Sequence, residues 1–298
     1  MASLEIHPLS DLRNEAAQLL AERFARQRAA EPLLPEIDDF TAHVPEDGHV
    51  ATRGGEAVAY LAGAIDGETG IARWLFAGHA AREPEALRDL FALQVEEFDV
   101  TRFMLTVPAS EPDLVDVWFR LAFGCQAIWA VREVEPAEPV DFGCAIRPAT
   151  PDDADAILGF DELLYSHQAA SPSISGLEAP PRDTLRQEVA EIWDDDSYIP
   201  FVAERDGRIV GMVGLYRRPQ GDLRVPASNI DLAFAATTDD VRGTGAGLAL
   251  TAHAMSWAHE QGFASMTVDW RSVNLLSSRF WPRRGFRPQY LRLYRAVP

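Results

Sequence analysis

Residues 241–247 read Val-Arg-Gly-Thr-Gly-Ala-Gly, and they join a predicted strand, residues 229–236, to a predicted helix, residues 248–262. Glycines let a backbone bend so that several amide N–H groups point into one small concavity, and the helix N-terminus adds about half a positive charge. The stretch therefore predicts a site for an anion such as a pyrophosphate, with Arg242 as a fixed cation. A plain tight turn between strand and helix is the alternative interpretation.

Two other glycine-rich motifs do not fit this stretch. A GxGxxG dinucleotide turn follows the first strand of a βαβ unit, whereas this turn follows the fourth predicted strand of its half of the chain. A P-loop requires a lysine, and all 27 basic residues of this chain are arginines. The absence of lysine also excludes lysine Schiff-base chemistry.

The two halves of the chain repeat each other. Each carries a hairpin signal, with turns at Gly54-Gly55 and at Asp206-Gly207, and each ends with a strand, a short helix, a glycine and a last strand. We interpret this pattern as a tandem duplication of one α/β unit. The predicted boundaries are residues 1–135 for the first copy, 136–143 for an acidic, proline-bearing linker and 144–298 for the second copy.

A second motif follows in the second copy, where residues 274–286 read NLLSSRFWPRRGF. An Arg-x-x-Gly-x-Gly turn followed by an Asn, a short helix and an aromatic-x3-Gly-Phe ending resembles the GCN5-related N-acetyltransferase (GNAT) family. The resemblance covers residues 144–298. It implies an α/β fold of the α+β mixed-sheet kind: two tandem GNAT (acyl-CoA N-acyltransferase) domains, each with a central, mostly antiparallel sheet flanked by helices.

The resemblance also implies a binding site for acetyl-CoA, with no metal. Backbone amides of residues 242–247 would hold the pyrophosphate, residues 235–237 would pair with pantetheine and polarise the acetyl carbonyl, and Asn274 would hydrogen-bond the pantetheine arm. The residues implied are Ala235, Ala236, Thr237, Arg242, Gly243, Thr244, Gly245, Ala246, Gly247, Asn274, Ser277, Phe280 and Trp281. Trp281 stands where many family members have a Tyr that protonates the departing thiolate, and an indole N–H cannot replace that phenol.

A general base must take a proton from the acceptor ammonium. The candidates are Asp269 at the end of the fifth strand, Asp231 on the fourth, and His167 with Tyr165 on the first helix of the second copy. Each also has an ordinary alternative, as an outward strand residue or an exposed helix-end side chain. The acceptor site would be built from the loops at residues 166–181 and 216–228.

The first copy is predicted to be degenerate. In register with residues 242–247 it has Arg82-Glu-Pro-Glu-Ala-Leu87, in which all three glycines are lost, two carboxylates would face a pyrophosphate, and Pro84 has no N–H. Acidic residues 111–113 stand opposite Asn274. We expect this copy to keep the fold without binding CoA.

Composition limits the partners. Acidic residues outnumber basic ones 46 to 27, giving a net charge of −19, so we expect no nucleic acid. Residues 1–142 carry 26 acidic and 11 basic side chains, which favours a cationic acceptor such as a polyamine, an aminoglycoside-like amine or a protein N-terminus. The N-terminus lacks a signal-peptide pattern and no stretch of about 18 apolar residues occurs, so we expect a cytoplasmic protein with no membrane contact. The arginine bias suggests a bacterial source.

The sequence thus predicts an acyltransferase of class EC 2.3.1 that moves an acetyl group from acetyl-CoA to a primary amine of a small, cationic acceptor. It predicts a monomer or a homodimer. The alternatives are an acyl-CoA-binding regulatory or scaffold protein without significant turnover, which Trp281 would permit, and a purely structural tandem domain. Replacement of Gly245 by Glu distinguishes the structural domain from the other two classes. It should abolish acyl-CoA binding by an enzyme or a binding protein and change nothing in a structural domain.

Overall fold

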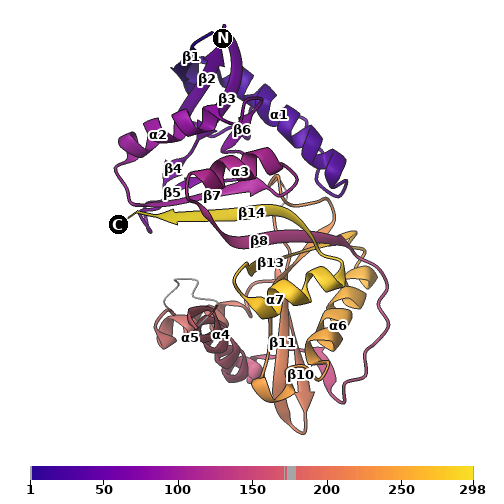
Figure 1. Cartoon of the computed structure of the whole chain (residues 1–298). Helices are drawn as coiled ribbons and strands as arrows, with labels where there is room; N and C mark the ends of the chain where they lie inside the picture. The colour runs from indigo at the N-terminus through magenta and orange to yellow at the C-terminus, as the bar shows by residue number, and fades with distance from the viewer. Residues whose placement is uncertain (1, 171, 173–178, 220, 298) are drawn as a thin grey trace. The chain divides into compact units, whose positions relative to one another are not determined.

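A computed structural model describes residues 2–170, 172, 179–219 and 221–297 (Figure 1). The chain forms two compact units. Unit 1 consists of Met1–Trp129 with Pro288–Pro298, and unit 2 of Ala130–Arg287. The last strand of the chain, which the repeat pattern assigns to the second copy, therefore completes unit 1.

Unit 1 contains two sheets and three α-helices. The first sheet has the order β1-β2-β3-β6 and the second contains β4-β5-β7-β14-β8. The strands are β1 (Leu4–Pro8), β2 (Gly48–Arg53), β3 (Glu56–Ala62), β4 (Ala64–Ile65), β5 (Ala72–Trp74), β6 (His79–Ala81), β7 (Arg102–Pro108), β8 (Gly124–Glu133) and β14 (Arg287–Ala296). The helices are α1 (Arg13–Ala30), α2 (Ala86–Phe98) and α3 (Pro112–Arg120). Aromatic rings in edge-to-face contact, among them Phe91, Trp118 and Phe123, fill its core.

Unit 2 contains one sheet with the order β13-β12-β11-β10-β9. The strands are β9 (Ala145–Pro148), β10 (Tyr198–Arg205), β11 (Arg208–Tyr216), β12 (Asn229–Thr237) and β13 (Ser265–Arg271), and the helices are α4 (Ala154–Ala169), α5 (Arg182–Glu191), α6 (Ala246–Glu260) and α7 (Leu275–Phe280). Among these strands β12 and β13 run parallel and the other pairs are antiparallel. The predicted α/β fold with mixed, mostly antiparallel sheets is confirmed.

The start of α4 shows how local sequence positions the site. Thr150 and Asp153 form a capping box, in which the Asp153 carboxylate accepts from the Thr150 N–H at 2.8 Å. Arg147 of β9 donates to both oxygens of Asp153, at 2.7 and 2.9 Å, and lowers the pKa of that carboxyl to about 2. The first helix of unit 2 is therefore fastened to the sheet at its N-terminus.

The helices of unit 2 cover its sheet on two sides, as Figure 1 shows. Apolar side chains of α4 and α5, such as Leu158 and Val189, pack against Val202 and Met212 of the sheet. We call the sheet face under α4 and α5 the acceptor face. Helix α6 packs against β10, β11 and β12 from the other side.

A β-bulge changes which side chains share the acceptor face. Gly214 of β11 pairs with Phe234, but Leu215 pairs with Leu232, so Ala233 is an extra residue in β12. The apolar alternation of residues 229–236 predicts Ile230, Leu232 and Phe234 on one face of the strand and Asp231 on the other, and this prediction is wrong. Because the bulge resets the alternation, Phe234 and Asp231 both lie on the acceptor face.

Candidate active site

The parallel strands of unit 2 part near the middle of the sheet. Their pairing runs from Asn229 opposite Ser265 to Leu232 opposite Val268, while β12 continues to Thr237 and β13 to Arg271. We call residues 233–237 the free segment of β12. Its backbone groups on the side toward β13 do not pair with that strand, and the predicted residues Ala235, Ala236 and Thr237 lie on it.

The glycine turn follows directly. Gly243 and Gly245 have φ of +81° and +109°, a region that L side chains rarely adopt, and a Cβ at either position would meet no atom within 4 Å. Helix α6 begins at Ala246. Within the described chain the amides of Gly243, Gly245, Ala246 and Gly247 donate to no backbone carbonyl. The turn therefore presents a group of free N–H donors at the positive end of a 15-residue helix.

Two side chains of the turn are engaged within it. The Arg242 guanidinium lies 2.6 Å from a carboxylate oxygen of Asp239, and the Thr244 hydroxyl donates to the Val241 carbonyl at 2.7 Å. Arg242 is thus a paired cation, although the sequence predicts one directed at the anion. The free donors of this turn are backbone groups.

Asn274 caps the short helix α7. Its Oδ1 accepts from the N–H groups of Leu276 at 3.1 Å and Ser277 at 3.3 Å, so its amide nitrogen is the part left to donate to a ligand. The His167 Nε2 of α4 lies 3.3 Å from the same oxygen. The structure therefore brings together two predicted site residues that are 107 positions apart.

The two predicted aromatic residues of α7 have different environments. Phe280 is half-buried beside the glycine turn, 3.6 Å from where a Cβ of Gly247 would lie, and the Arg284 guanidinium stacks on its ring at 3.9 Å. Trp281 is 6% exposed and packs edge-on against Phe280 and Phe286. Trp281 therefore contributes to the core of unit 2, whereas Phe280 borders the turn.

Two carboxylates predicted as bases share the acceptor face and differ in their partners. Asp231 is 3% exposed, accepts from Arg218 at 2.5 and 2.8 Å, and accepts from the Thr267 hydroxyl at 2.8 Å. A carboxylate held in this way forms a structural ion pair, and its oxygens already accept hydrogen bonds, so it is poorly suited to act as the base. Asp269, two residues after Thr267, lies beyond the last paired residues of β13.

Asp269 combines access to solvent with a perturbed pKa. Its side chain is exposed, yet the surrounding protein desolvates it enough to raise the pKa of its carboxyl to about 6, and the nearby charge of Asp231 adds to the rise. A carboxyl with this pKa is deprotonated at pH 7 and can still accept a proton. Asp269 is the predicted base whose environment best suits that role.

Two residues of the acceptor face are missing from the sequence predictions. The phenol of Tyr198 of β10 packs directly over Gly214 of β11, where a Cβ would fall 1.9 Å from its hydroxyl. Asp161 of α4 is half-buried, and burial together with the charge of Glu188 raises the pKa of its carboxyl to about 6. Asp161 and Tyr165 are four residues apart on α4, a spacing that places them on one helix face and could have drawn attention to them.

In unit 1, the turn and the strand that correspond to the glycine turn and to β12 have their backbone groups bound by other parts of the same unit. In the turn before α2, the amides of Arg82 and Glu83 donate to the Val58 carbonyl, and those of Ala86, Leu87 and Arg88 donate to carbonyls within the turn. The strand that would match β12 is broken into β5, which pairs with β7, and β6, which pairs with β3. At the break, the fully buried Arg23 of α1 donates to the carbonyls of Phe76 and His79 at 2.6 and 2.5 Å.

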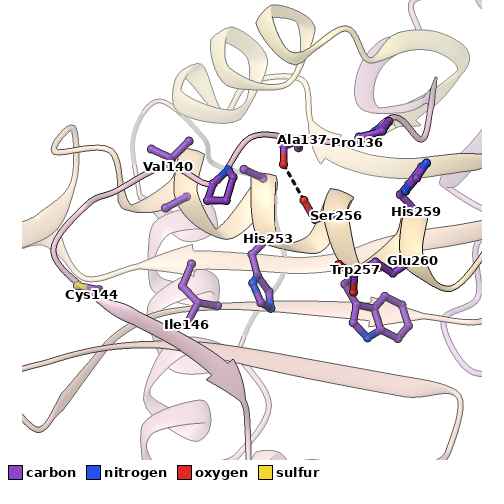
Figure 2. Close-up of a pocket in the computed structure, with 13 residues that line it drawn as sticks. Pro136, Ala137, Val140, Cys144, Ile146, His253, Ser256, Trp257, His259 and Glu260 are labelled. Atoms are coloured by element: carbon purple, nitrogen blue, oxygen red, sulfur yellow. Dashed lines mark hydrogen bonds between the residues drawn. The ribbon is translucent and has the colours of Figure 1, made fainter.

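A cavity of about 600 Å³ lies elsewhere in unit 2, between the linker and α6 (Figure 2). His253, Trp257 and Glu260 line it from the helix, and the Ser256 hydroxyl donates to the Ala137 carbonyl of the linker at 2.9 Å. It borders the middle and the C-terminal end of α6, away from the glycine turn. The hydrogen bond fastens the linker to the helix.

In the ranges that the structure describes, no three His, Cys, Asp or Glu side chains are grouped to hold a metal ion. Nor does any helix in those ranges have the length and apolar character needed to cross a bilayer.

The parted parallel strands, and the helix beside them that begins with unbonded amides, are the place where the resemblance to GNAT domains predicts the acyl-CoA site. The acetyltransferase (GNAT) family model matches residues 162–286. This part of the chain belongs to the acetyltransferase (GNAT) family, and the protein is an acyltransferase of class EC 2.3.1.

Solved structures agree on the fold of the whole chain. A GCN5-related N-acetyltransferase from Sphaerobacter thermophilus superposes with a TM-score of 0.62 at 13% identity, over 98% of this chain and 95% of that one. A GNAT-family acetyltransferase from Colwellia psychrerythraea gives 0.54 at 13% identity, over 99% and 100%. A tandem GNAT protein from the clavulanic acid biosynthesis pathway gives 0.50 at 15% identity, over 99% of both chains. No curated protein matches the sequence.

Proposed function

We propose that the protein transfers an acetyl group from acetyl-CoA to a primary amine of a small, cationic acceptor, and that unit 2 carries this activity. The observation that supports the proposal most strongly is the group of amides at Gly243, Gly245, Ala246 and Gly247, which donate to no backbone carbonyl in the described chain, close to the free segment of β12. A pyrophosphate needs several converging donors, and a Cβ at Gly243 or Gly245 would meet no protein atom within 4 Å, so space is open beside these amides.

Separate segments of unit 2 would bind the different parts of the cosubstrate. Backbone amides of residues 243–247 would bind the pyrophosphate, and the free segment of β12 would pair with the pantetheine arm. The Asn274 amide nitrogen would donate to the same arm while its oxygen caps α7. Ser277 and Phe280 would border the ligand from α7.

When bound, acetyl-CoA supplies the acetyl group as a thioester. A backbone N–H of the free segment, next to the bulge at Ala233, would polarise the acetyl carbonyl. Asp269 would take one proton from the acceptor ammonium, and the resulting amine would form a C–N bond as the C–S bond breaks. The thiolate leaves with the second proton of that nitrogen, passed through water, because Trp281 is buried in the core.

The acidic side chains of the acceptor face support a cationic acceptor. Asp161, Glu188 of α5 and Asp269 are close to this face, and the chain as a whole carries a charge of −19. The predicted cytoplasmic location, bacterial source and monomeric or dimeric state belong to this proposal as expectations.

The test is release of free CoA from acetyl-CoA in the presence of small amines, which include diamines, polyamines and cationic amino acids. The proposal predicts CoA release that depends on the amine, with an acetylated amine of matching amount detected by mass. Tight acetyl-CoA binding with no amine-dependent release would contradict it and favour a binding protein without turnover.

A further inference from the structure

The acceptor face carries one arginine whose situation differs from that of its neighbours. Arg218 and Arg147 of unit 2 are each held by carboxylates, at 2.5 and 2.7 Å. Arg271, the last residue of β13, is half-buried, and in the ranges that the structure describes its guanidinium forms no ion pair and no hydrogen bond. Burial lowers the pKa of this guanidinium, because the charged form is less stable when it is partly removed from water.

The position of Arg271 links it to the reaction. Asp269 and Arg271 are two residues apart on β13, so their side chains leave the same face of the strand, about 7 Å apart at their origins. Both lie beyond Val268, the last residue that pairs with β12. The proposed base and an unpaired cation thus stand side by side where the two strands part.

Polar groups of the acceptor face lie around Arg271. Tyr165 of α4 is close enough to Arg271, Asp161 and Glu188 for all three charges to affect its pKa. Asp269 thus neighbours Arg271 on β13, Tyr165 lies within electrostatic reach of Arg271, and Asp161 and Glu188 lie within reach of Tyr165. A ligand complementary to these groups has an ammonium, a carboxylate next to it, and a second cation a few bonds away.

We propose that the acceptor is an α-amino acid with a cationic side chain, whose carboxylate is bound by Arg271 and whose α-ammonium faces Asp269. Its side-chain cation faces Asp161 and Glu188. This inference rests on the proposed acetyltransferase function and narrows the acceptor class. A guanidinium meets a carboxylate through two parallel N–H···O bonds, which explains why an arginine with no ion pair in the described ranges stands beside the proposed base. The chemistry remains that of amide formation: Asp269 takes a proton, the α-nitrogen forms the C–N bond, and CoA leaves as its thiol.

The experiment is a calorimetric titration of the full chain, saturated with CoA, with amino acids and their decarboxylated counterparts. The matched probes are L-lysine with cadaverine and L-ornithine with putrescine. We expect at least one amino acid to bind roughly 10- to 100-fold more tightly than its diamine. Arg271→Gln should abolish that difference by weakening the amino acid alone, and Arg186→Gln, which removes an exposed guanidinium of α5, should leave it unchanged.

Three results would overturn the inference: diamines that bind as tightly as the amino acids, amino acid binding that Arg271→Gln does not weaken, or an Arg271→Gln effect confined to CoA, which would assign Arg271 to the cosubstrate. Release of CoA from acetyl-CoA is measured separately. An amino acid that binds through Arg271 without being acetylated supports the inference and contradicts the proposed function. Acetylation of diamines but not of amino acids supports the proposed function and contradicts the inference.

Discussion

The turns that open α2 and α6 occupy equivalent places in the two units and use their backbone amides in opposite ways. In unit 2 the amides of Gly243, Gly245, Ala246 and Gly247 donate to no backbone carbonyl within the described residues, and a Cβ at Gly243 or Gly245 would meet no atom within 4 Å. In unit 1 the amides of residues 82, 83 and 86–88 are taken up by carbonyls, and Glu85 is held by Arg88 and Arg120. The comparison shows that the fold is kept when the ligand site is lost, because backbone carbonyls then accept from the amides of the turn.

A second difference concerns the place where the strands part. In unit 2 this place is bordered by Asp269 and Arg271, whereas in unit 1 the side chain of Arg23 supplies donors to the carbonyls that the strand break exposes. Both units join their first helix to the cap of their last short helix, through Arg26 and Glu111 in unit 1 and through His167 and Asn274 in unit 2. The shared contact supports duplication, and the changed residue types mark the divergence.

The largest expected effect comes from making the unit 2 turn resemble that of unit 1. Gly245→Glu places a side chain at a φ of +109° and a carboxylate against the proposed pyrophosphate, so acetyl-CoA affinity should fall by at least about 100-fold. Calorimetry with acetyl-CoA measures the loss. Gly207→Glu, at a φ of +74° in the β10–β11 turn, is the matched control and should bind normally. If both variants bind acetyl-CoA equally well, the glycine turn is not part of the binding site.

Asp269→Asn should lower kcat by roughly 100- to 1,000-fold while acetyl-CoA still binds, because the variant cannot accept a proton. The base works when deprotonated, and desolvation by the surrounding protein raises the pKa of its carboxyl to about 6. In the native protein kcat/KM should therefore fall about tenfold for each pH unit below 6 and level off above it. A profile whose acidic limb persists unchanged in Asp269→Asn would assign the base to another group.

Substitutions of Asn274 distinguish its role as the cap of α7 from its proposed role in binding acetyl-CoA. Asn274→Asp keeps an oxygen that caps α7 and loses the amide donor, so acetyl-CoA binding should weaken roughly tenfold with little change in melting temperature. Asn274→Ala loses both functions and should also destabilise the protein by about 1 kcal/mol. If Asn274→Asp binds acetyl-CoA as the native protein does, Asn274 acts only as a helix cap.

The smallest effect on binding is expected from unit 1. Arg23→Met leaves two buried carbonyls without their donor, and should lower the free energy of unfolding by about 2–4 kcal/mol. The affinity of the folded protein for acetyl-CoA should not change. A gain of a second acetyl-CoA site in this variant would show that Arg23 alone keeps unit 1 empty.

Local signals in the sequence predict much of this molecule. The Thr150–Asp153 capping box begins α4, the turns at residues 54–55 and 206–207 connect the predicted hairpins, and the two motifs at residues 241–247 and 274–286 lie on the predicted turn and helix. Each of these features depends on residues close together in the chain, so short-range patterns are sufficient to find them.

Features that depend on tertiary neighbours were not predictable. The bulge at Ala233 follows from pairing between strands and overturns the alternation expected for Asp231 and Phe234. The pairing of Asp231 with Arg218, and the burial of Trp281, depend on side chains brought in from other elements. The position of the last strand in unit 1 depends on its pairing with β7, which no repeat pattern reveals. Part of the predicted acceptor loops, residues 171, 173–178 and 220, lies outside the described residues.

The central claim is that one of two copies of the same fold binds acetyl-CoA. Calorimetric titration of the intact chain with acetyl-CoA tests it most directly, through the number of sites. The account predicts one site per chain, present in the native protein and lost in Gly245→Glu. Two sites per chain, or one site that survives Gly245→Glu, would contradict it.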